Sequence, residues 1–309
     1  MSILVAADFS AAEWAAWWPA LHAALPGETL LRDSSDPSGV EIALVANPTA
    51  GLLATLPRLR LIQSLWAGVD RLLADASLPA NIPLARMVDP MLSRAIAETA
   101  LWAVLSLHRD FIDYAAQQHR REWRQRAQRR ADQVTVAVLG LGEMGRATAL
   151  RLAANGYPVL GWSTHRVALG GVITRSGAAA LEPLLAEAEI VVNLLPLTAA
   201  TRGLFDRRRL GSMRNGASLV NLGRGAHVVE PDLLDALASK HLRHAVLDVF
   251  DSEPLSPEHS FWAHPQVTVL PHIAALTDPH SAALVVARNV HALRSGAPLS
   301  HLVDRSRGY

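Results

Sequence analysis

The segment from Val134 to Gly145, which reads VTVAVLGLGEMG, constrains the fold of this chain more than any other. Val134–Val138 are β-branched or aliphatic residues, which predicts a short buried strand, and Arg146–Ala154 has the pattern of a helix. Between them lies a glycine-rich turn made of Gly140, Leu141, Gly142, Glu143, Met144 and Gly145. A strand, a G-x-G-x-x-G turn and a helix in succession form a dinucleotide-binding fingerprint, because the glycines let the backbone turn tightly and approach a pyrophosphate at the helix N-terminus. The segment therefore predicts that these residues bind a dinucleotide.

Composition places the chain among ordered globular proteins. Half of its 309 residues are apolar and 18% are charged, which argues against disorder, and the length suits one large domain or two of ordinary size. The formal net charge of +1 gives no general reason to expect nucleic-acid or membrane binding, and the absence of cysteine excludes disulfides, thiolate catalysis and cysteine-based metal sites. The N-terminal MSILVAADFS lacks the charged and apolar regions of a signal peptide, and no apolar run is long enough to cross a bilayer. We therefore expect a cytoplasmic enzyme with no metal, nucleic-acid or membrane partner.

Residues 1–95 alternate short apolar runs with helical stretches, which predicts a parallel sheet covered on both faces. The expected strands are Ile3–Ala6, Thr29–Leu31, Ile42–Ala46, Leu61–Ser64 and Leu84–Met87. The expected helical stretches are Ala11–Leu25, Gly51–Leu56 and a short one around Arg71–Ala76. Trp14, Trp17 and Trp18 lie at i, i+3, i+4 spacing on the first helix, which favours a core-facing or interface stripe over a cofactor site.

Two segments connect this region to the fingerprint. Ala95–Gln118 contains no glycine or proline and predicts one long helix. His119–Arg130 follows as HRREWRQRAQRR, with six arginines and one glutamate. Such a run can mark a site for nucleic acid or an anionic surface, but it is one short run in a near-neutral chain, without a spread of interleaved aromatic residues. A solvated arm or an interface segment is therefore the favoured interpretation.

After the fingerprint the alternation of strands and helices resumes and predicts, with Val134–Leu139, a six-stranded Rossmann-type sheet. The other expected strands are Val159–Trp162, Ile190–Leu194, Ser218–Asn221, His244–Leu247 and Val267–Leu270, with helical segments such as Leu181–Ala188 and Glu230–Ser239 between them. A final helix, Ser281–Ser295, is placed to return the chain to the first domain. We therefore expect two α/β domains with a cleft between them: residues 1–95 plus 281–309, and a dinucleotide-binding domain over residues 96–280.

The residues after the next strand bear on which dinucleotide binds. NAD-selective Rossmann folds usually place an Asp or Glu here to accept a hydrogen bond from the ribose 2′-hydroxyl, and this chain has neither. The polar residues of this stretch are Ser163, Thr164, His165 and Arg166. Hydroxyls and a guanidinium can hydrogen-bond a 2′-phosphate, which a carboxylate would repel. We therefore predict that NADP(H) is preferred, whereas a merely solvated Arg166 would leave NAD(H) acceptable as well.

Three later segments each put one ionisable residue directly after a strand, at the edge where open α/β sheets bind ligands. These residues are Arg224 in Asn221–Gly225, Glu253 in Asp248–Pro254 and His272 in Pro271–Ala274. If these three residues converge on a nicotinamide, they suit hydride transfer to a carbonyl next to a carboxylate. The imidazole would protonate the alkoxide, the glutamate would orient the imidazole, and the guanidinium would hold the carboxylate. Each residue alone also has a structural explanation, so the prediction rests on the three together.

With these motifs the chain resembles the D-isomer-specific 2-hydroxyacid dehydrogenases over nearly its whole length. The matching stretches are Gly140–Gly145, Asn193–Thr198 with Thr201, Asn221–Gly225, Leu247–Pro254 and Pro271–Ala274. Within the family it looks most like the glyoxylate/hydroxypyruvate reductases, on the basis of Trp162-Ser163, Trp262-x-His264-Pro265 and Val303–Tyr309.

The resemblance implies a two-lobed enzyme in which a flavodoxin-like substrate domain joins the Rossmann-type domain and acts on a 2-oxo acid or 2-hydroxy acid. It implies that Ala67, Gly68 and Val69 offer backbone N–H groups to the substrate carboxylate. We expect Trp66, which directly precedes them, to line the substrate site as well. Further cofactor contacts are implied for Leu195, Pro196, Thr201, Leu222, Gly223, Asp248 and Ala274. Family members are commonly homodimers, which gives Ala95–Arg130 an interface role.

Two positions depart from the glyoxylate reductases that the chain resembles. Ala46 stands where they carry a bulky tryptophan, and Trp66 stands where glycine is usual. Glyoxylate or hydroxypyruvate is the first expectation for the substrate, and a bulkier aryl or branched 2-oxo acid is the alternative. A non-catalytic NAD(P)(H)-sensing protein is a further alternative, against which the intact Arg-Glu-His set argues.

Overall fold

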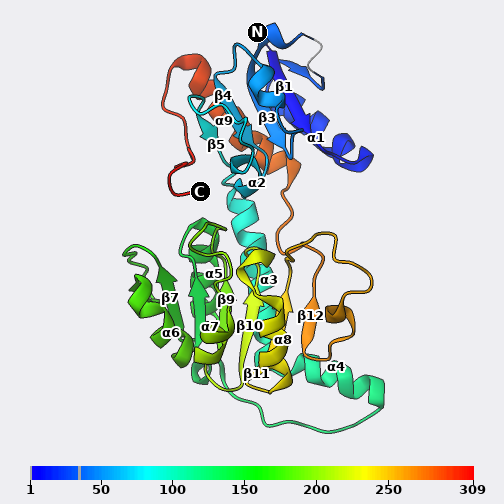
Figure 1. The fold of residues 1–309 in the computed structure, drawn as a ribbon, viewed down its shortest axis with the longest axis vertical. Helices are drawn as coiled ribbons and strands as arrows, with labels where there is room; N and C mark the ends of the chain where they lie inside the picture. The colour runs from blue at the N-terminus through cyan, green and yellow to red at the C-terminus, as the bar shows by residue number, and fades with distance from the viewer. Residues whose placement is uncertain (1, 34–35) are drawn as a thin grey trace. The chain divides into compact units, whose positions relative to one another are not determined.

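The computed structural model describes residues 2–33 and 36–309 and divides the chain into two compact units. Unit 1 consists of Met1–Leu92 and Thr277–Tyr309, and unit 2 of Ser93–Leu276. In the described residues, unit 1 has a five-stranded sheet and unit 2 a seven-stranded sheet, and all neighbouring strands within each sheet run parallel (Figure 1). The predicted fold class, α/β with two parallel sheets, is confirmed.

The sheet of unit 1 has the strand order β2-β1-β3-β4-β5, which is the flavodoxin-like order. Its strands are β1 (Ser2–Ala7), β2 (Thr29–Leu31), β3 (Val40–Ala46), β4 (Leu61–Ser64) and β5 (Leu84–Ala85). Its α-helices are α1 (Ala11–Ala24), α2 (Asp70–Leu73) and α9 (Pro279–Ser295). The helix expected over Gly51–Leu56 is a short 3-10 helix, Leu52–Thr55, and a second one spans Pro37–Gly39.

Both ends of the chain contribute to the core of unit 1. α1 begins with a capping box, in which Ser10 Oγ accepts a hydrogen bond from the Glu13 N–H and the Glu13 carboxylate accepts one from the Ser10 N–H. Trp17 of α1 and Val286 of α9 are buried in the same apolar cluster over the sheet. Arg294 of α9 also forms ion pairs with two glutamates of the N-terminal segment, Glu28 and Glu41. Residues far apart in sequence therefore form one core.

The sheet of unit 2 has the order β12-β11-β10-β9-β6-β7-β8, which is the Rossmann order 3-2-1-4-5-6 extended by one strand at the β12 edge. Its strands are β6 (Val136–Leu139), β7 (Val159–Ser163), β8 (Ile173–Ser176), β9 (Ile190–Asn193), β10 (Ala217–Asn221), β11 (Leu242–Leu247) and β12 (Val267–Val269). The prediction of six strands is wrong, because it omitted β8. This edge strand reads ITRS and is partly exposed, so it carries no apolar run that would reveal it.

The helices of unit 2 differ from the prediction in several respects, among them the start of the first helix at Pro90 rather than Ala95. They are α3 (Pro90–His108, which begins in unit 1), α4 (Phe111–Arg120), α5 (Glu143–Ala154), α6 (Leu181–Glu187), α7 (Arg207–Ser212) and α8 (Glu230–Ala238). The single helix expected over Ala95–Gln118 is broken at Asp110, whose φ of 58° lies in the left-handed region. Arg126 and Arg243 both pair with the Asp110 carboxylate, so long-range ion pairs favour the break. The fingerprint helix begins at Glu143 rather than Arg146.

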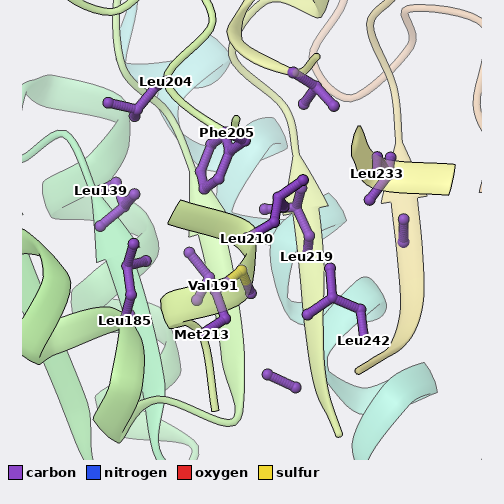
Figure 2. Packing of buried hydrophobic residues seen from close by; sticks show 14 of the residues in the cluster. Leu139, Leu185, Val191, Leu204, Phe205, Leu210, Met213, Leu219, Leu233 and Leu242 are labelled. Carbon is purple, nitrogen blue, oxygen red and sulfur yellow. The ribbon is translucent and has the colours of Figure 1, made fainter. Parts of the chain in front are cut away.

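The central strands of unit 2 bury both faces, as expected for a parallel sheet covered by helices. Leu139, Val191 and Leu219 point into one apolar cluster, where Figure 2 shows them with Phe205 and Leu210. Their neighbours in the strands point into a second cluster on the opposite face: Val136, Val138, Val192 and Val220. The sheet therefore has a core on each side, which positions the loops at the carboxyl ends of its strands.

An arm, defined here as residues 121–130, follows α4 without regular helix or strand. Arg126 pairs with Asp110 at 3.0 Å, and Arg129 pairs with Glu189 at 2.5 Å, so two arginines attach the arm to unit 2. Trp123 of the arm is 96% exposed. Within the described residues, no helix combines the length and apolarity that a transmembrane span requires.

Candidate active site

The glycine-rich turn between β6 and α5 has the shape that a pyrophosphate needs. A Cβ placed at Gly145 would lie 1.6 Å from the Gly140 carbonyl oxygen, so only glycine allows α5 to pack this closely. Gly140 itself has a φ of 93°, which lies in the region that glycine favours. A Cβ at Gly142 would meet no atom of the chain within 4 Å, so this backbone is open to a ligand at the N-terminus of α5. These residues fit a dinucleotide.

The four residues predicted to select the cofactor lie at and just after the end of β7. Ser163 ends the strand, and its hydroxyl donates a hydrogen bond to the His165 carbonyl oxygen at 2.5 Å. Thr164, His165 and Arg166 are exposed. The end of β7 therefore presents hydroxyl, imidazole and guanidinium groups to solvent and no carboxylate.

His272 and Glu253, which follow β12 and β11, form a direct pair. The Glu253 Oε2 atom lies 2.7 Å from His272 Nδ1, and its Oε1 accepts a hydrogen bond from the Phe250 N–H at 2.9 Å. The His272 side chain is 52% exposed, so one edge of the ring is held while the ring remains accessible. The arrangement suits a histidine that exchanges a proton with a bound molecule.

The electrostatics of the pair stabilise the imidazolium. The hydrogen bond to Glu253 and the charge of that carboxylate raise the pKa of His272 above its usual value, against the opposing effects of partial burial and of Arg224. Burial would raise the pKa of Glu253, but the hydrogen bonds from His272 and Phe250 and the charges of His272 and Arg224 hold it below its usual value. The pair therefore favours protonated histidine beside ionised glutamate.

Asp248, the first residue after β11, holds the backbone of the His272 loop. Its carbonyl oxygen accepts a hydrogen bond from the His272 N–H at 2.9 Å, and its carboxylate accepts from the N–H groups of Ile273 and Ala274 at 2.7 and 3.0 Å. His272 has a φ of 54°, an uncommon conformation for a residue with a side chain, and these bonds stabilise it. Burial raises the pKa of the Asp248 carboxyl, although the two N–H groups oppose the shift.

Arg224 follows β10, the strand next to β11. Its backbone carbonyl accepts a hydrogen bond from Asn221 Nδ2 at 2.9 Å, and its Nη1 donates to the Gly223 carbonyl at 2.8 Å. A Cβ at Gly225 would lie 1.9 Å from the Phe250 carbonyl carbon, so the loop of Arg224 packs tightly on the loop of Glu253. The structure therefore brings the three predicted residues to neighbouring strand ends of one sheet.

The other predicted cofactor residues surround the same edge of unit 2. Thr201 Oγ1 donates a hydrogen bond to the Pro196 carbonyl at 2.7 Å, which closes the loop after β9. Among these residues, Leu195, Thr201, Leu222 and Ala274 are buried. His227 was not predicted as a site residue, yet it is fully buried and its Nδ1 accepts a hydrogen bond from the Arg224 N–H. In the sequence His227 lies three residues after Arg224, but this spacing alone does not indicate that the two residues contact each other.

In unit 1, the predicted substrate residues form the turn between β4 and α2. The indole of Trp66 packs edge-on against Phe9 and Trp17, with ring centroids 5.9 and 6.0 Å apart. In the part of the chain that the structure describes, no hydrogen bond leads from the N–H groups of Gly68 or Val69 to another protein group. Two backbone donors of this turn therefore remain available to a ligand.

The sequence model of the D-isomer specific 2-hydroxyacid dehydrogenase NAD-binding domain matches residues 101–274, which contain the glycine-rich turn and all three ionisable residues. The chain belongs to the D-isomer specific 2-hydroxyacid dehydrogenase family. This dehydrogenase is 38% identical over 307 residues to the glyoxylate/hydroxypyruvate reductase A of Serratia proteamaculans, covering 97% of both chains. The enzyme of that name from Citrobacter koseri is 38% identical over 301 residues, covering 95% of this chain and 96% of the relative.

Solved structures of family members have the same fold as this dehydrogenase. A family member from Xanthobacter autotrophicus Py2, in complex with NADPH and MES, has a TM-score of 0.94 and 39% identity, with 100% of this chain and 99% of that chain covered. An NADPH-dependent glyoxylate/hydroxypyruvate reductase from Sinorhizobium meliloti, in complex with NADP and sulfate, has a TM-score of 0.94 and 36% identity over the full length of both chains. Family membership makes this chain an NAD(P)-dependent oxidoreductase.

Proposed function

We propose that this dehydrogenase reduces the C2 carbonyl of a 2-oxo acid with NADPH and yields the D-2-hydroxy acid. The observation that carries the proposal is the 2.7 Å contact between His272 Nδ1 and Glu253. Because Glu253 occupies Nδ1, Nε2 is the nitrogen that donates a proton to the substrate oxygen. The raised pKa of His272 keeps the ring protonated closer to neutral pH, as a general acid requires.

The residues of unit 2 suit NADP(H), which when bound supplies the hydride for C2. The groups proposed to hold it are the turn Gly140–Gly145, the polar stretch Ser163–Arg166, and Leu195, Pro196, Thr201, Leu222, Gly223, Asp248 and Ala274. The absence of an acidic residue after β7 and the exposed Arg166 support a preference for NADPH, with NADH as a weaker alternative. Two of the solved relatives are described with NADPH or NADP, which agrees with this preference.

The ionisable side chains bind the substrate and supply the proton. The planar guanidinium of Arg224 binds the substrate carboxylate and polarises the adjacent carbonyl. As negative charge develops on the carbonyl oxygen, His272 transfers its proton to that oxygen, and the nearby carboxylate of Glu253 stabilises the imidazolium beforehand. In unit 1, we propose that Trp66 lines the substrate site and that the N–H groups of Ala67, Gly68 and Val69 bind the carboxylate.

A survey of NADPH oxidation with a panel of 2-oxo acids, repeated with NADH, tests the proposal. The His272→Ala variant is expected to lower kcat by roughly 10²–10⁴-fold while NADPH still binds, because the ring acts on the substrate and not on the cofactor. Arg224→Ala is expected to raise KM for 2-oxo acids and to have a smaller effect on ketones without a carboxylate. A wild-type protein that binds NADPH but oxidises it with none of the acids would be a nucleotide-sensing protein instead.

Small and bulky 2-oxo acids are the two candidate classes of substrate, and the aromatic contacts of Trp66 favour the bulky class. Glyoxylate or hydroxypyruvate follows from the named relatives. However, Ala46 is small and buried at the end of β3, and Trp66 adds an indole supported by Phe9 and Trp17 directly before the carboxylate-binding turn. An apolar aromatic surface suits an aryl or branched 2-oxo acid. A comparison of kcat/KM for glyoxylate and phenylpyruvate decides between the two classes.

We also propose that the protein is a homodimer in which the arm contributes to the interface. Trp123 is 96% exposed on a segment that Arg126 and Arg129 attach to unit 2 by ion pairs. A large apolar side chain held outward in this way is a typical anchor for a second chain.

A further inference from the structure

We propose that His227 is a positioning residue that holds the backbone of Arg224 and the loop at Pro196 together, one through each of its ring nitrogens. The inference rests on the proposed function, because it concerns how the arginine assigned to the substrate carboxylate is kept in place. His227 is fully buried at the end of the 3-10 helix Gly225–His227, directly after the loop of Arg224.

The backbone around His227 selects one tautomer of the ring. Nδ1 accepts a hydrogen bond from the Arg224 N–H at 3.2 Å, and because an amide N–H only donates, Nδ1 carries no proton. Nε2 lies 3.2 Å from the Pro196 carbonyl oxygen, which only accepts, so Nε2 carries the proton and donates it. Asn193 Nδ2 gives Nδ1 a second donor at 2.8 Å. Both nitrogens of the neutral ring are therefore used.

Two asparagines complete this buried network at the ends of neighbouring strands. Asn193 of β9 donates to Asn221 Oδ1 of β10 at 2.9 Å, and Asn221 donates in turn to the Arg224 carbonyl at 2.9 Å. Arg224 is thus held through both its N–H and its carbonyl. A Cβ at Gly223 would lie 3.0 Å from the Leu195 carbonyl oxygen and 3.2 Å from His227 Cε1, so the two loops and the ring are closely packed.

The network connects the two proposed functions of unit 2. The Pro196 carbonyl, which His227 contacts, also accepts a hydrogen bond from Thr201 in the loop assigned to the cofactor. The Arg224 backbone, which His227 also contacts, carries the guanidinium assigned to the substrate. Loss of the Nδ1 contact removes the acceptor that His227 offers to the Arg224 N–H, and loss of the Nε2 contact leaves the Pro196 carbonyl with the Thr201 hydroxyl. Either loss weakens the connection between the two loops and lets one move relative to the other.

Two substitutions separate the two contacts. In His227→Asn, the carboxamide oxygen can replace Nδ1 as the acceptor for Arg224, but the donor to Pro196 is lost. In His227→Gln, the longer amide can replace Nε2 as the donor to Pro196, but the acceptor for Arg224 is lost. His241, which is partly buried and whose Nε2 lies 3.1 Å from the Leu210 carbonyl oxygen, provides a matched control in His241→Gln.

The readouts are KM for the best 2-oxo acid at saturating NADPH, and the Kd of NADPH from fluorescence. His227→Gln is expected to raise KM about tenfold with Kd within about twofold, and His227→Asn to raise Kd about tenfold with a smaller change in KM. His241→Gln is expected to change neither. Equal effects of both His227 variants on both readouts, in parallel with a lower melting temperature, would mean a purely structural role and overturn the inference.

A double-mutant cycle with Arg224→Ala tests whether His227 changes KM through Arg224. If His227 acts through Arg224, His227→Gln adds little to the KM increase of Arg224→Ala, whereas additive effects contradict the inference. If Arg224→Ala alone leaves KM unchanged, the proposed function of Arg224 is wrong, and the inference fails with it. If Arg224→Ala raises KM and His227→Gln does not, only the inference fails.

Discussion

Replacement of Glu253 by glutamine is expected to slow reduction at neutral pH and to move the pH dependence of kcat/KM to lower pH. The wild-type carboxylate lies 2.7 Å from His272 Nδ1 and raises the pKa of the imidazole. Reduction needs the protonated ring, so the rate falls as pH rises through the pKa of His272. A neutral amide at position 253 removes the charge that favours protonation, and the falling limb of the profile then begins at lower pH.

The size of the effect follows from the exposure of the pair. A hydrogen bond to a charged group contributes about 1.5–3 kcal/mol, and solvent screening of the half-exposed His272 reduces this to the lower end of the range. Since 1.4 kcal/mol corresponds to a factor of ten, kcat/KM at neutral pH is expected to fall roughly tenfold. The loss is expected to shrink on acidification, because the variant ring becomes protonated again.

The assay is the initial rate of NADPH oxidation from pH 5 to 9, with deuterated cofactor to establish that the chemical step limits the rate. Glu258→Gln is the matched control, because it removes an exposed carboxylate of the same loop region that has no hydrogen bond to His272 in the described residues. A Glu253→Gln profile that superimposes on the wild-type profile, or one that moves to higher pH, refutes the assigned role of the pair.

Three further predictions concern the cofactor turn, the arm, and the ion pairs that connect α9 to the N-terminal segment of unit 1. Gly142→Ala is expected to weaken NADPH binding at least about tenfold with an unchanged melting temperature, because the added Cβ has free space in the protein but obstructs the pyrophosphate. Gly170→Ala is the control, because a Cβ at Gly170 also lies in open space. Trp123→Ala is expected to shift the protein towards monomers in sedimentation or light scattering, and an unchanged mass refutes an interface role of the arm. Arg294→Ala is expected to lower the free energy of unfolding by about 2 kcal/mol, because it leaves the largely buried Glu28 without its cation and Glu41 with the more distant Arg60 at 3.9 Å. Because the pKa of Glu28 is lowered in the folded protein, its share of this stabilisation is present above pH 4.5 and is lost as pH falls through the folded pKa, which denaturant titrations at pH 7 and 4 can measure.

The elements that the sequence predicted best are those whose pattern is local and strong. β6 and β9 are short apolar runs buried on both faces, and each was predicted to within two residues at either end. The edge strand β8 was missed, because its exposed side chains give it no apolar pattern and its place depends on pairing with β7. The division between α3 and α4 was missed for a related reason, since Arg126 and Arg243 reach Asp110 from residues that are distant in the chain.

In the candidate site, too, local motifs were predicted from the sequence and long-range contacts were not. The glycine-rich turn is a local motif, and the steric need for Gly145 is visible in the sequence as a fixed spacing. The positions of Arg224, Glu253 and His272 followed from a topological rule, because the carboxyl ends of parallel strands lie at one edge of a sheet. The network of His227, in contrast, joins residues from two loops and from the ends of two strands, and it has no short motif.

Side-chain periodicity and spacing within single connections were sufficient to predict the two parallel sheets, the dinucleotide turn and the set of ionisable residues at the strand ends. The folded structure was needed to show which atoms these residues present to one another. It placed Glu253 on Nδ1 of His272, attached the His272 loop to Asp248, and seated His227 between Arg224 and Pro196. These contacts could not be predicted, because hydrogen-bond geometry depends on tenths of an ångström between segments far apart in the chain, and close packing of the whole core sets those distances.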